Sequence, residues 1–157
     1  MGPGSIADRF ATSLTMHTKQ RLVAVGSRSA RRRSDFAERH GAESSYASYE
    51  ALTADPAVDI IYVATPTSHH HEGTMLALRA GKHVLVEKSF AKNAGQAHEM
   101  VHEAERRDLF IMEGMWPRFL PFMDSVRQVL DKGLIGDPVC LQADLGGFEQ
   151  YDPDGRM

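Results

Sequence analysis

A glutamate and a lysine stand together directly after a short apolar run. The run is His83-Val84-Leu85-Val86, and Glu87 and Lys88 follow it. Such a run predicts a buried strand, and parallel sheets bind their ligands at the carboxyl ends of the strands. Partial burial there would lower the pKa of the Lys88 ammonium and make it a usable general acid or base. The alternative is an ordinary surface ion pair between Glu87 and Lys88.

The start of the chain has the glycine spacing of a pyrophosphate-binding turn. Gly2-Pro3-Gly4-Ser5-Ile6-Ala7 fits the pattern G-x-G-x-x-G/A and precedes residues of helical spacing. Glycines allow a tight turn and a close approach of the backbone, and the helix that follows offers free N–H groups. The strand that this motif requires is absent, because Met1 alone precedes it. A tag-like or disordered start is therefore the alternative.

The residues after a second apolar run, Leu22 to Val25, indicate which nicotinamide dinucleotide would bind. NAD sites usually have a carboxylate there for the ribose 2′-hydroxyl, whereas this chain continues Gly26-Ser27-Arg28-Ser29. Hydroxyls and a guanidinium suit a 2′-phosphate. We therefore expect Ser27 and Arg28 to favour NADP over NAD, with Arg31 or Arg32 adding positive charge. Arg33 is expected on a solvated helix face.

Three consecutive histidines follow a third apolar run. The segment is Thr65-Pro66-Thr67-Ser68-His69-His70-His71-Glu72. Adjacent histidines point in different directions, whereas helical zinc ligands are spaced i, i+4, so no metal site is predicted. Ser68 could cap the next helix. Thr65, Pro66 and His70 are the candidates to pack around the cofactor.

Short apolar runs alternate with longer helical patterns along the whole chain. This order, with strands that lack clean polar alternation, predicts an α/β fold with a doubly wound, Rossmann-type parallel sheet covered on both faces. Strands are expected over residues 22–25, 59–64, 83–86, 109–112 and 139–145. Helices are expected over residues 5–17, 34–40, 70–80, 94–107 and 122–132.

Composition excludes several classes of protein. The 157 residues carry a net charge of −3, which gives no global field for nucleic acid. The single cysteine, Cys140, allows no intramolecular disulfide, and no apolar stretch approaches the length of a membrane span. The chain also begins without the pattern of a signal peptide. A cytoplasmic protein that does not bind nucleic acid is expected.

Several ordered motifs together resemble the Gfo/Idh/MocA oxidoreductases over nearly the whole chain. Besides the glycine segment, they are Ala64-Thr65-Pro66 with His70, Ala80-Gly81-Lys82-His83-Val84-Leu85-Val86-Glu87-Lys88, and Met112-Glu113-Gly114-Met115-Trp116-Pro117-Arg118-Phe119. The last segment is most similar to the branch that holds dimeric dihydrodiol dehydrogenases and NADP-dependent xylose dehydrogenases.

The resemblance implies a Rossmann domain over residues 1–120, followed over 121–157 by the beginning of a C-terminal substrate and dimerisation domain. It implies that Lys88 is catalytic and that Glu87 lies near the nicotinamide. It also assigns the cofactor-binding turn to Gly2, Gly4, Ser5 and Ile6, and further cofactor contacts to Trp116, Arg118 and Phe119.

Three departures from the family pattern bear on activity. Ser89 stands where the family has proline, so Lys88 would be held less rigidly. The first strand, which is central in such sheets, is missing, and the chain reaches Met157 before the family's Asp-x-Gly-x-Tyr/His motif. We therefore expect this chain alone to be nearly inactive.

The function that these inferences favour is hydride transfer between NADP and a carbinol or carbonyl of a sugar, polyol or dihydrodiol. The parent protein would be a homo-oligomer by the same resemblance. The alternative is a non-catalytic dinucleotide-binding module, against which Lys88 argues, since pure binding needs no general acid.

Overall fold

The computed structural model describes residues 1–144 and residue 146, and the chain divides into two compact units. The first unit spans Met1–Gly114 and the second spans Met115–Met157. Each unit is described by itself below. The extent of the two expected domains, 1–120 and 121–157, stays a prediction.

Five short parallel strands form two separate sheets in the first unit. Strand β1 (Ala24–Gly26) pairs with β2 (Ser44–Tyr46). Strand β4 (His83–Val86) lies between β3 (Ile60–Val63) and β5 (Ile111–Glu113). Parallel strands with helical crossovers confirm the expected α/β, Rossmann-type fold.

Helices connect the strands and have local reasons to begin and end where they do. The elements are α1 (Ser5–His17), α2 (Ala30–His40), α3 (Tyr49–Ala54), η1 (Thr67–His69), α4 (His70–Arg79) and α5 (Ala94–Arg106). Side chains of Ser29, Ser48 and Asn93 accept N–H bonds at the starts of α2, α3 and α5. Gly41 follows α2 with a φ of 67°, a left-handed conformation that glycine adopts without strain.

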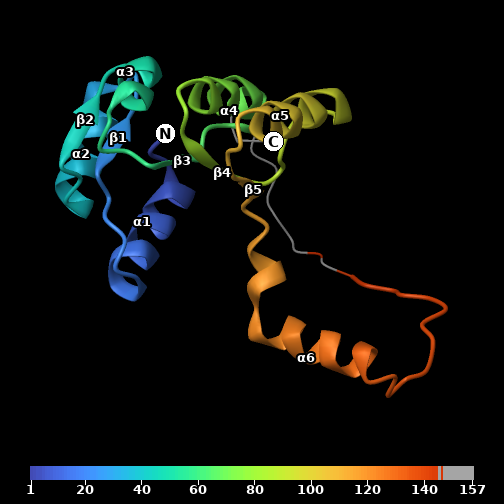
Figure 1. Cartoon of the computed structure of the whole chain (residues 1–157). Helices are drawn as coiled ribbons and strands as arrows, with labels where there is room; N and C mark the ends of the chain where they lie inside the picture. The colour runs from blue at the N-terminus through green and yellow to red at the C-terminus, as the bar shows by residue number, and fades with distance from the viewer. Residues whose placement is uncertain (145, 147–157) are drawn as a thin grey trace. The chain divides into compact units, whose positions relative to one another are not determined.

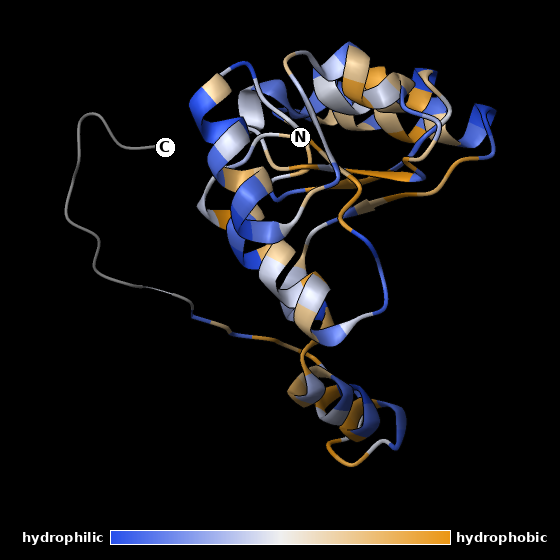
Figure 2. Cartoon of the chain, turned by 90° about the vertical axis from the view of Figure 1, so that its left-hand side faces the viewer, coloured by the Kyte–Doolittle hydropathy of each residue, from blue (hydrophilic) through white to orange (hydrophobic). Residues whose placement is uncertain are grey.

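Apolar side chains pack into two clusters, one on each side of the strands. In the first cluster, residues of β3 and β4 pack against α3, α4 and α5, with Leu78 and Met100 fully buried. In the second, Ala11 of α1 and Phe36 of α2 pack with Val25 of β1. The strands run between the helices in Figure 1, and Figure 2 shows much of their length in the hydrophobic colour.

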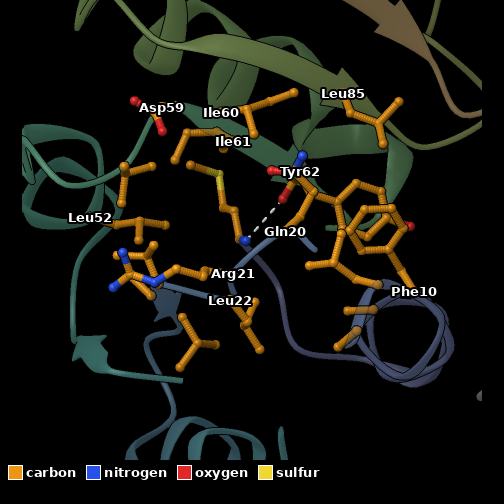
Figure 3. A pocket seen from close by; sticks show the side chains of 18 of the residues that line it. Phe10, Gln20, Arg21, Leu22, Leu52, Asp59, Ile60, Ile61, Tyr62 and Leu85 are labelled. Carbon is orange, nitrogen blue, oxygen red and sulfur yellow. Dashed lines mark hydrogen bonds between the residues drawn. The ribbon is translucent and has the colours of Figure 1, made fainter. Parts of the chain in front are cut away.

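Two consecutive residues, Met1 and Gly2, join the two sheets. The amino group of Met1 donates to the carbonyl of Tyr62 on β3 at 2.9 Å, and the Met1 carbonyl accepts from Ala64 at 3.0 Å. The next residue, Gly2, donates to the Gly26 carbonyl of β1 at 3.2 Å. The amino terminus thus lies between β1 and β3 (Figure 1), and Met1 pairs with β3 through its backbone as a strand residue does; its bond to Tyr62 is the dashed line in Figure 3.

The β3–β5 sheet is not covered equally on its two faces, contrary to the expectation of full cover. Val63 and Val86 face α4 and α5 and are wholly buried. The opposite face carries Leu85, which is partly buried, and Ile60, which is 52% exposed. Strands β3 and β4 therefore alternate between buried and more exposed positions.

Other expectations about the elements need correction. Helix α2 begins at Ala30 and is capped by Ser29, so Ser34 lies inside it rather than at its start. Ser68 lies within the 3-10 turn before α4 and makes no cap. Strand β2 and helix α3 were not expected from the sequence.

The second unit contains η2 (Trp116–Phe119) and the helix α6 (Pro121–Asp131). Residues 139–144 form no strand, so that expectation is wrong for them, and residue 145 lies outside the described residues. Val139 is 97% exposed and Leu141 is 89% exposed. An apolar run without a partner strand has no backbone pairing to hold it extended. Among the described residues, no helix is long and apolar enough to cross a membrane.

Candidate functional site

The glycine turn, Gly2-Pro3-Gly4, brings the backbone close to the end of β3. Gly2 has a φ of 80°, and a Cβ atom on it would lie 2.9 Å from both the amide nitrogen and the Cγ2 of Thr65. Gly4 donates to the Gly2 carbonyl at 2.9 Å and caps α1, which begins at Ser5 and Ile6. Glycine is required at Gly2 because both the conformation and the space exclude a side chain.

The amino end of α1 presents free donors. The first N–H groups of a helix have no partner inside it, and no side chain caps this end. The one acidic residue of the first turn, Asp8, is turned to α2, where His40 and Arg39 lie 2.7 and 2.6 Å from its Oδ1. Hydrogen bonds from His40 and Arg39 hold the pKa of Asp8 below its usual range. The helix end thus keeps its partial positive charge for an anionic ligand.

Thr65 lies next to this turn with an unused hydroxyl. Its side-chain Oγ1 is buried and has no hydrogen-bond partner among the described residues. A buried hydroxyl without a partner is costly. A polar ligand group beside Gly2 and Thr65 would supply the missing bond, so these residues fit the pyrophosphate side of a dinucleotide.

Ser27 and Arg28 follow β1, as the sequence predicts, but their surroundings differ. Ser27 is buried, its Oγ accepts from the Ser29 N–H at 3.3 Å, and its carbonyl accepts from Arg33 Nη1 at 2.8 Å. Arg33 is therefore anchored, and the expectation of a solvated side chain is wrong for it. Arg28 is exposed, and Arg31 forms an ion pair with Asp35 at 3.7 Å. The guanidinium of Arg28 is thus accessible to a 2′-phosphate.

Glu87 is held by a tyrosine rather than by its neighbour Lys88. Tyr62 on β3 donates from its hydroxyl to Glu87 Oε1 at 2.6 Å, and the Lys88 backbone N–H donates to Glu87 Oε2 at 3.2 Å. Burial and the Glu87 carboxylate raise the pKa of Tyr62 well above its usual value, so Tyr62 remains a donor. This geometry excludes the surface Glu87–Lys88 ion pair as the role of this carboxylate.

Lys88 is exposed, which corrects the expectation that it is partly buried. Its ammonium makes no hydrogen bond or ion pair with any residue that the structure describes. A flexible ammonium at the carboxyl end of β4 remains free to contact a substrate oxygen.

The segment after Lys88 is anchored although Ser89 replaces the family's proline. His70, which is 1% exposed, places Nδ1 2.8 Å from the Ser89 carbonyl and Nε2 2.8 Å from the Thr65 carbonyl. On the other side, the Phe90 N–H donates to Glu113 Oε1 at 2.8 Å. The contacts from α4 and β5 therefore restrain the backbone around Ser89, as a proline at this position would.

The remaining candidate contacts have different placements. Pro66 precedes η1 at the end of β3. Trp116, Arg118 and Phe119 belong to the second unit, so their part in a cofactor site stays a prediction. The residues 1–144 and 146 contain no group of three or more histidine, cysteine, aspartate or glutamate side chains that could hold a metal ion.

Tyr62 and Glu113 contribute to the site although their sequence positions do not mark them as members of it. Tyr62 is two residues before Ala64 and faces away from the buried Val63. A phenol within an otherwise aliphatic strand was the available signal, because a buried hydroxyl needs a partner. Nothing in the local sequence marks Glu113, whose partner lies 23 residues earlier.

A glycine turn at a helix amino terminus, an unsatisfied threonine beside it and a charged pair after β4 define a dinucleotide-binding α/β domain. Comparison with known proteins then gives the family. The model of the oxidoreductase family Gfo/Idh/MocA, with an NAD-binding Rossmann fold, matches residues 1–115. The chain belongs to this family, as its motifs indicate.

Individual relatives agree with that assignment. The chain is 40% identical to trans-1,2-dihydrobenzene-1,2-diol dehydrogenase of Bos taurus, over 91% of this chain and 43% of that protein. It is 42% identical to the NADP(+) D-xylose 1-dehydrogenase of Hypocrea jecorina, over 92% of this chain and 40% of that protein. The chain therefore spans about two-fifths of the length of these relatives.

The fold also matches solved structures. KijD10, a 3-ketoreductase from Actinomadura kijaniata in complex with TDP-benzene and NADP, superposes with a TM-score of 0.78 at 36% identity, over 87% of this chain and 43% of the other. An NAD-binding oxidoreductase from Klebsiella pneumoniae gives a TM-score of 0.81 at 29% identity, over 88% of this chain and 39% of the other.

Proposed function

We propose that this chain is the NADP-binding part of a dehydrogenase that acts on a carbinol or carbonyl of a sugar, polyol or dihydrodiol. The observation that carries the proposal is the arrangement around Glu87. This carboxylate is fixed by Tyr62 from the neighbouring strand, while Lys88, the next residue, keeps its ammonium free. The relatives that act on xylose, on a dihydrodiol or with NADP support the substrate class.

Different residues bind the cofactor and transfer the proton in this proposal. The free backbone N–H groups of Ser5 and Ile6 bind the pyrophosphate, Gly2 and Gly4 form the turn that lets it approach the backbone, and the Thr65 hydroxyl supplies a further contact. The bound nicotinamide supplies the redox chemistry. Lys88 gives or takes the proton of the reacting oxygen.

The remaining contacts keep these groups in place. Tyr62 fixes the carboxylate of Glu87, and His70 fixes the backbone of Ser89 and Thr65. Trp116 and Arg118 would add cofactor contacts from the second unit. A homo-oligomeric, cytoplasmic protein is part of this proposal.

The cofactor preference follows from the end of β1. No carboxylate follows Gly26, and the exposed Arg28 can meet a 2′-phosphate. We expect NADPH to bind this chain more tightly than NADH. Charge reversal in Arg28→Asp should remove most of that difference, since a hydrogen bond to a charged group contributes about 1.5–3 kcal/mol, or roughly ten- to hundredfold in affinity.

The test is calorimetric titration of the chain with NADPH and with NADH. The matched control is Arg79→Asp, because Arg79 is equally exposed but lies at the carboxyl end of α4. Arg28→Asp should weaken NADPH and spare NADH, and Arg79→Asp should change neither. Equal affinity for both nucleotides in the unmodified chain would overturn the NADP assignment, and no binding of either would overturn the proposed function.

A further inference from the structure

The side chain of Arg33 reaches back from α2 to the end of β1. Its Nη1 donates to the carbonyl of Ser27 at 2.8 Å. Arg33 lies near the start of α2, and helical side chains point toward the amino end of their helix. The contact therefore brings a guanidinium onto the loop of residues 27–29, which joins β1 to α2.

This loop is held by its own polar groups and by that one long side chain. The Ser27 N–H donates to the Tyr46 carbonyl of β2 at 3.0 Å, and the Ser27 hydroxyl accepts from the Ser29 N–H at 3.3 Å. The Ser29 hydroxyl caps α2. Among the described residues, the Ser27 carbonyl accepts from Arg33 alone.

The Ser27 carbonyl bears on the direction of the Arg28 side chain. A peptide unit is planar, so the C=O of Ser27 and the Cα of Arg28 lie in one plane. Ser27 is 7% exposed, whereas Arg28 is exposed. A bond at the Ser27 carbonyl therefore restrains the backbone from which Arg28 leaves, and the Arg28 guanidinium stays accessible.

Helices α2 and α3 lie on opposite faces of β1. Phe36 of α2 belongs to one core cluster and Leu52 of α3 belongs to the other. Burial raises the pKa of Tyr49 at the start of α3, and the charge of Arg28 acts on it in the opposite direction. The charge of Arg28 thus acts on the α3 side of β1, whereas Arg33 binds the loop from the α2 side.

No carboxylate of the described residues draws Arg33 away from the loop. Two other arginines of α2 do form ion pairs, Arg31 with Asp35 at 3.7 Å and Arg39 with Asp8 at 2.6 Å. The salt bridges within the described part of the chain do not include Arg33. Its guanidinium is therefore anchored by the Ser27 carbonyl.

We propose that Arg33 is a positioning residue for NADP, which holds the Ser27 carbonyl and so orients Arg28 toward the 2′-phosphate. This inference rests on the proposed function, in which Arg28 meets that phosphate. A guanidinium suits the task because its planar fork loses little freedom for each hydrogen bond that it forms. NAD lacks the 2′-phosphate, so Arg33 affects the affinity for NADP and not the affinity for NAD.

The test is calorimetric titration of Arg33 variants with NADPH and with NADH. Arg33→Ala should weaken NADPH binding about tenfold and leave NADH binding unchanged. Arg33→Lys keeps a donor for the Ser27 carbonyl and should restore most of the lost affinity. If Arg33→Ala fails to fold, Arg33→Met replaces it, since methionine keeps an aliphatic stem but donates no bond.

Arg32→Ala is the matched variant for the loss of charge. It removes one positive charge from the same turn of α2, and the exposed Arg32 contacts Ser29 through its backbone N–H. It should weaken NADPH binding about twofold or less, because exposed charges interact weakly. Equal losses in Arg32→Ala and Arg33→Ala would mean that Arg33 contributes only to the general positive field, and would overturn the proposal.

The double variant Arg28→Ala/Arg33→Ala separates positioning from direct contact. If Arg33 acts through Arg28, its replacement should cost almost nothing further once Arg28 is alanine, because residues that act together are not additive. Additive losses would mean that Arg33 binds the phosphate by itself, and equal losses for NADPH and NADH would mean a general loss of structure. Either result would overturn the positioning role.

Failure of this inference is distinct from failure of the proposed function. An unmodified chain that binds neither nucleotide would overturn the proposed function and the role of Arg33 with it. An unmodified chain that prefers NADPH, with the same preference in Arg33→Ala, would overturn the role of Arg33 alone.

Discussion

Two regions of the first unit contribute to the proposed site, and they are built from different groups. The glycine turn leads into the free backbone N–H groups at the start of α1, which come from residues that are adjacent in sequence. The segment Glu87–Ser89 depends on side chains from other elements, because Tyr62, His70 and Glu113 hold Glu87, Ser89 and the following Phe90.

In the proposed site, the glycine turn contributes to binding of the cofactor, and the Glu87–Ser89 segment contributes to the chemistry. A backbone turn fixes a pyrophosphate by conformation alone, so changes of conformation should affect it most. The Glu87–Ser89 segment and the following Phe90 are fixed by three long-range contacts, so the loss of one partner should affect local order and stability before it affects binding.

The largest effect concerns the amino group of Met1, beside the glycine turn. Burial lowers the pKa of this amino group to about 5 from 8.0. Between pH 8 and pH 5 the unfolded chain binds a proton that the folded chain does not, so the free energy of unfolding falls as pH falls. A shift of three pH units corresponds to up to about 4 kcal/mol.

Acetylation of the amino terminus should remove this pH dependence. The acetylated nitrogen keeps an N–H donor for Tyr62 but has no charge to gain. Urea denaturation of the free and the acetylated chain at pH 5, 6.5 and 8 measures the difference. Parallel pH profiles of the two forms would show that the amino group is not buried in the folded chain.

His70→Leu should give the next largest loss, in the Glu87–Ser89 region. The ring nitrogens of His70 contact the buried carbonyl of Thr65 and the partly buried carbonyl of Ser89. Leucine would remove the ring from the buried Thr65 carbonyl, at a cost of about 1–3 kcal/mol. His98→Leu is the control, because His98 is exposed on α5 and should change the free energy of unfolding little. Equal stabilities of the two variants would contradict the anchoring role.

Gly2→Ala should weaken NADPH binding about tenfold or more, because the added Cβ would lie 2.9 Å from Thr65 and the turn must move. Gly41→Ala is matched to it. Gly41 also has a positive φ, 67°, but a Cβ there meets nothing within 4 Å. Both variants should lose about 1–2 kcal/mol of stability through backbone strain, and Gly2→Ala should lose more because of the clash with Thr65. Only Gly2→Ala should lose affinity in a titration. If both variants lost affinity for NADPH, the effect of Gly2→Ala would be due to general destabilisation and not to a change at the pyrophosphate site.

The same contrast explains what the sequence predicted. The glycine turn and α1 follow from adjacent residues, and β4 has the bounds expected from its apolar run, His83–Val86. Strand β2 was missed because Ser44-Ser45-Tyr46 carries no apolar signal and pairs through its backbone with β1. The exposure of Lys88 was also missed, because burial after a strand depends on packing that local sequence does not specify.

The long-range side-chain contacts of the site could not be predicted from the spacing of residues along the sequence. Tyr62 and Glu87 are 25 residues apart, and His70 and Ser89 are 19 residues apart. Such pairs meet only when β3 and β4 align in register, with Val63 opposite Val86. The order of strands and helices in the sequence places these loops at one edge of the sheet, but the side chains that bond across that edge depend on the register of the strands.

Tyr62→Phe should have the smallest effect on stability and the most local one. It removes the hydroxyl that donates to Glu87 at 2.6 Å, at about 1–2 kcal/mol. Tyr46→Phe removes an equivalent bond, from Tyr46 to the Asp55 carboxylate at 2.9 Å, and should cost a similar amount. The two variants should differ at Lys88, whose backbone N–H donates to the Glu87 carboxylate. Freed from Tyr62, that carboxylate moves, so amide exchange at Lys88 should speed up in Tyr62→Phe and remain unchanged in Tyr46→Phe. Equal exchange at Lys88 in both variants would mean that Tyr62 only contributes to packing, and that Glu87 is held by other contacts.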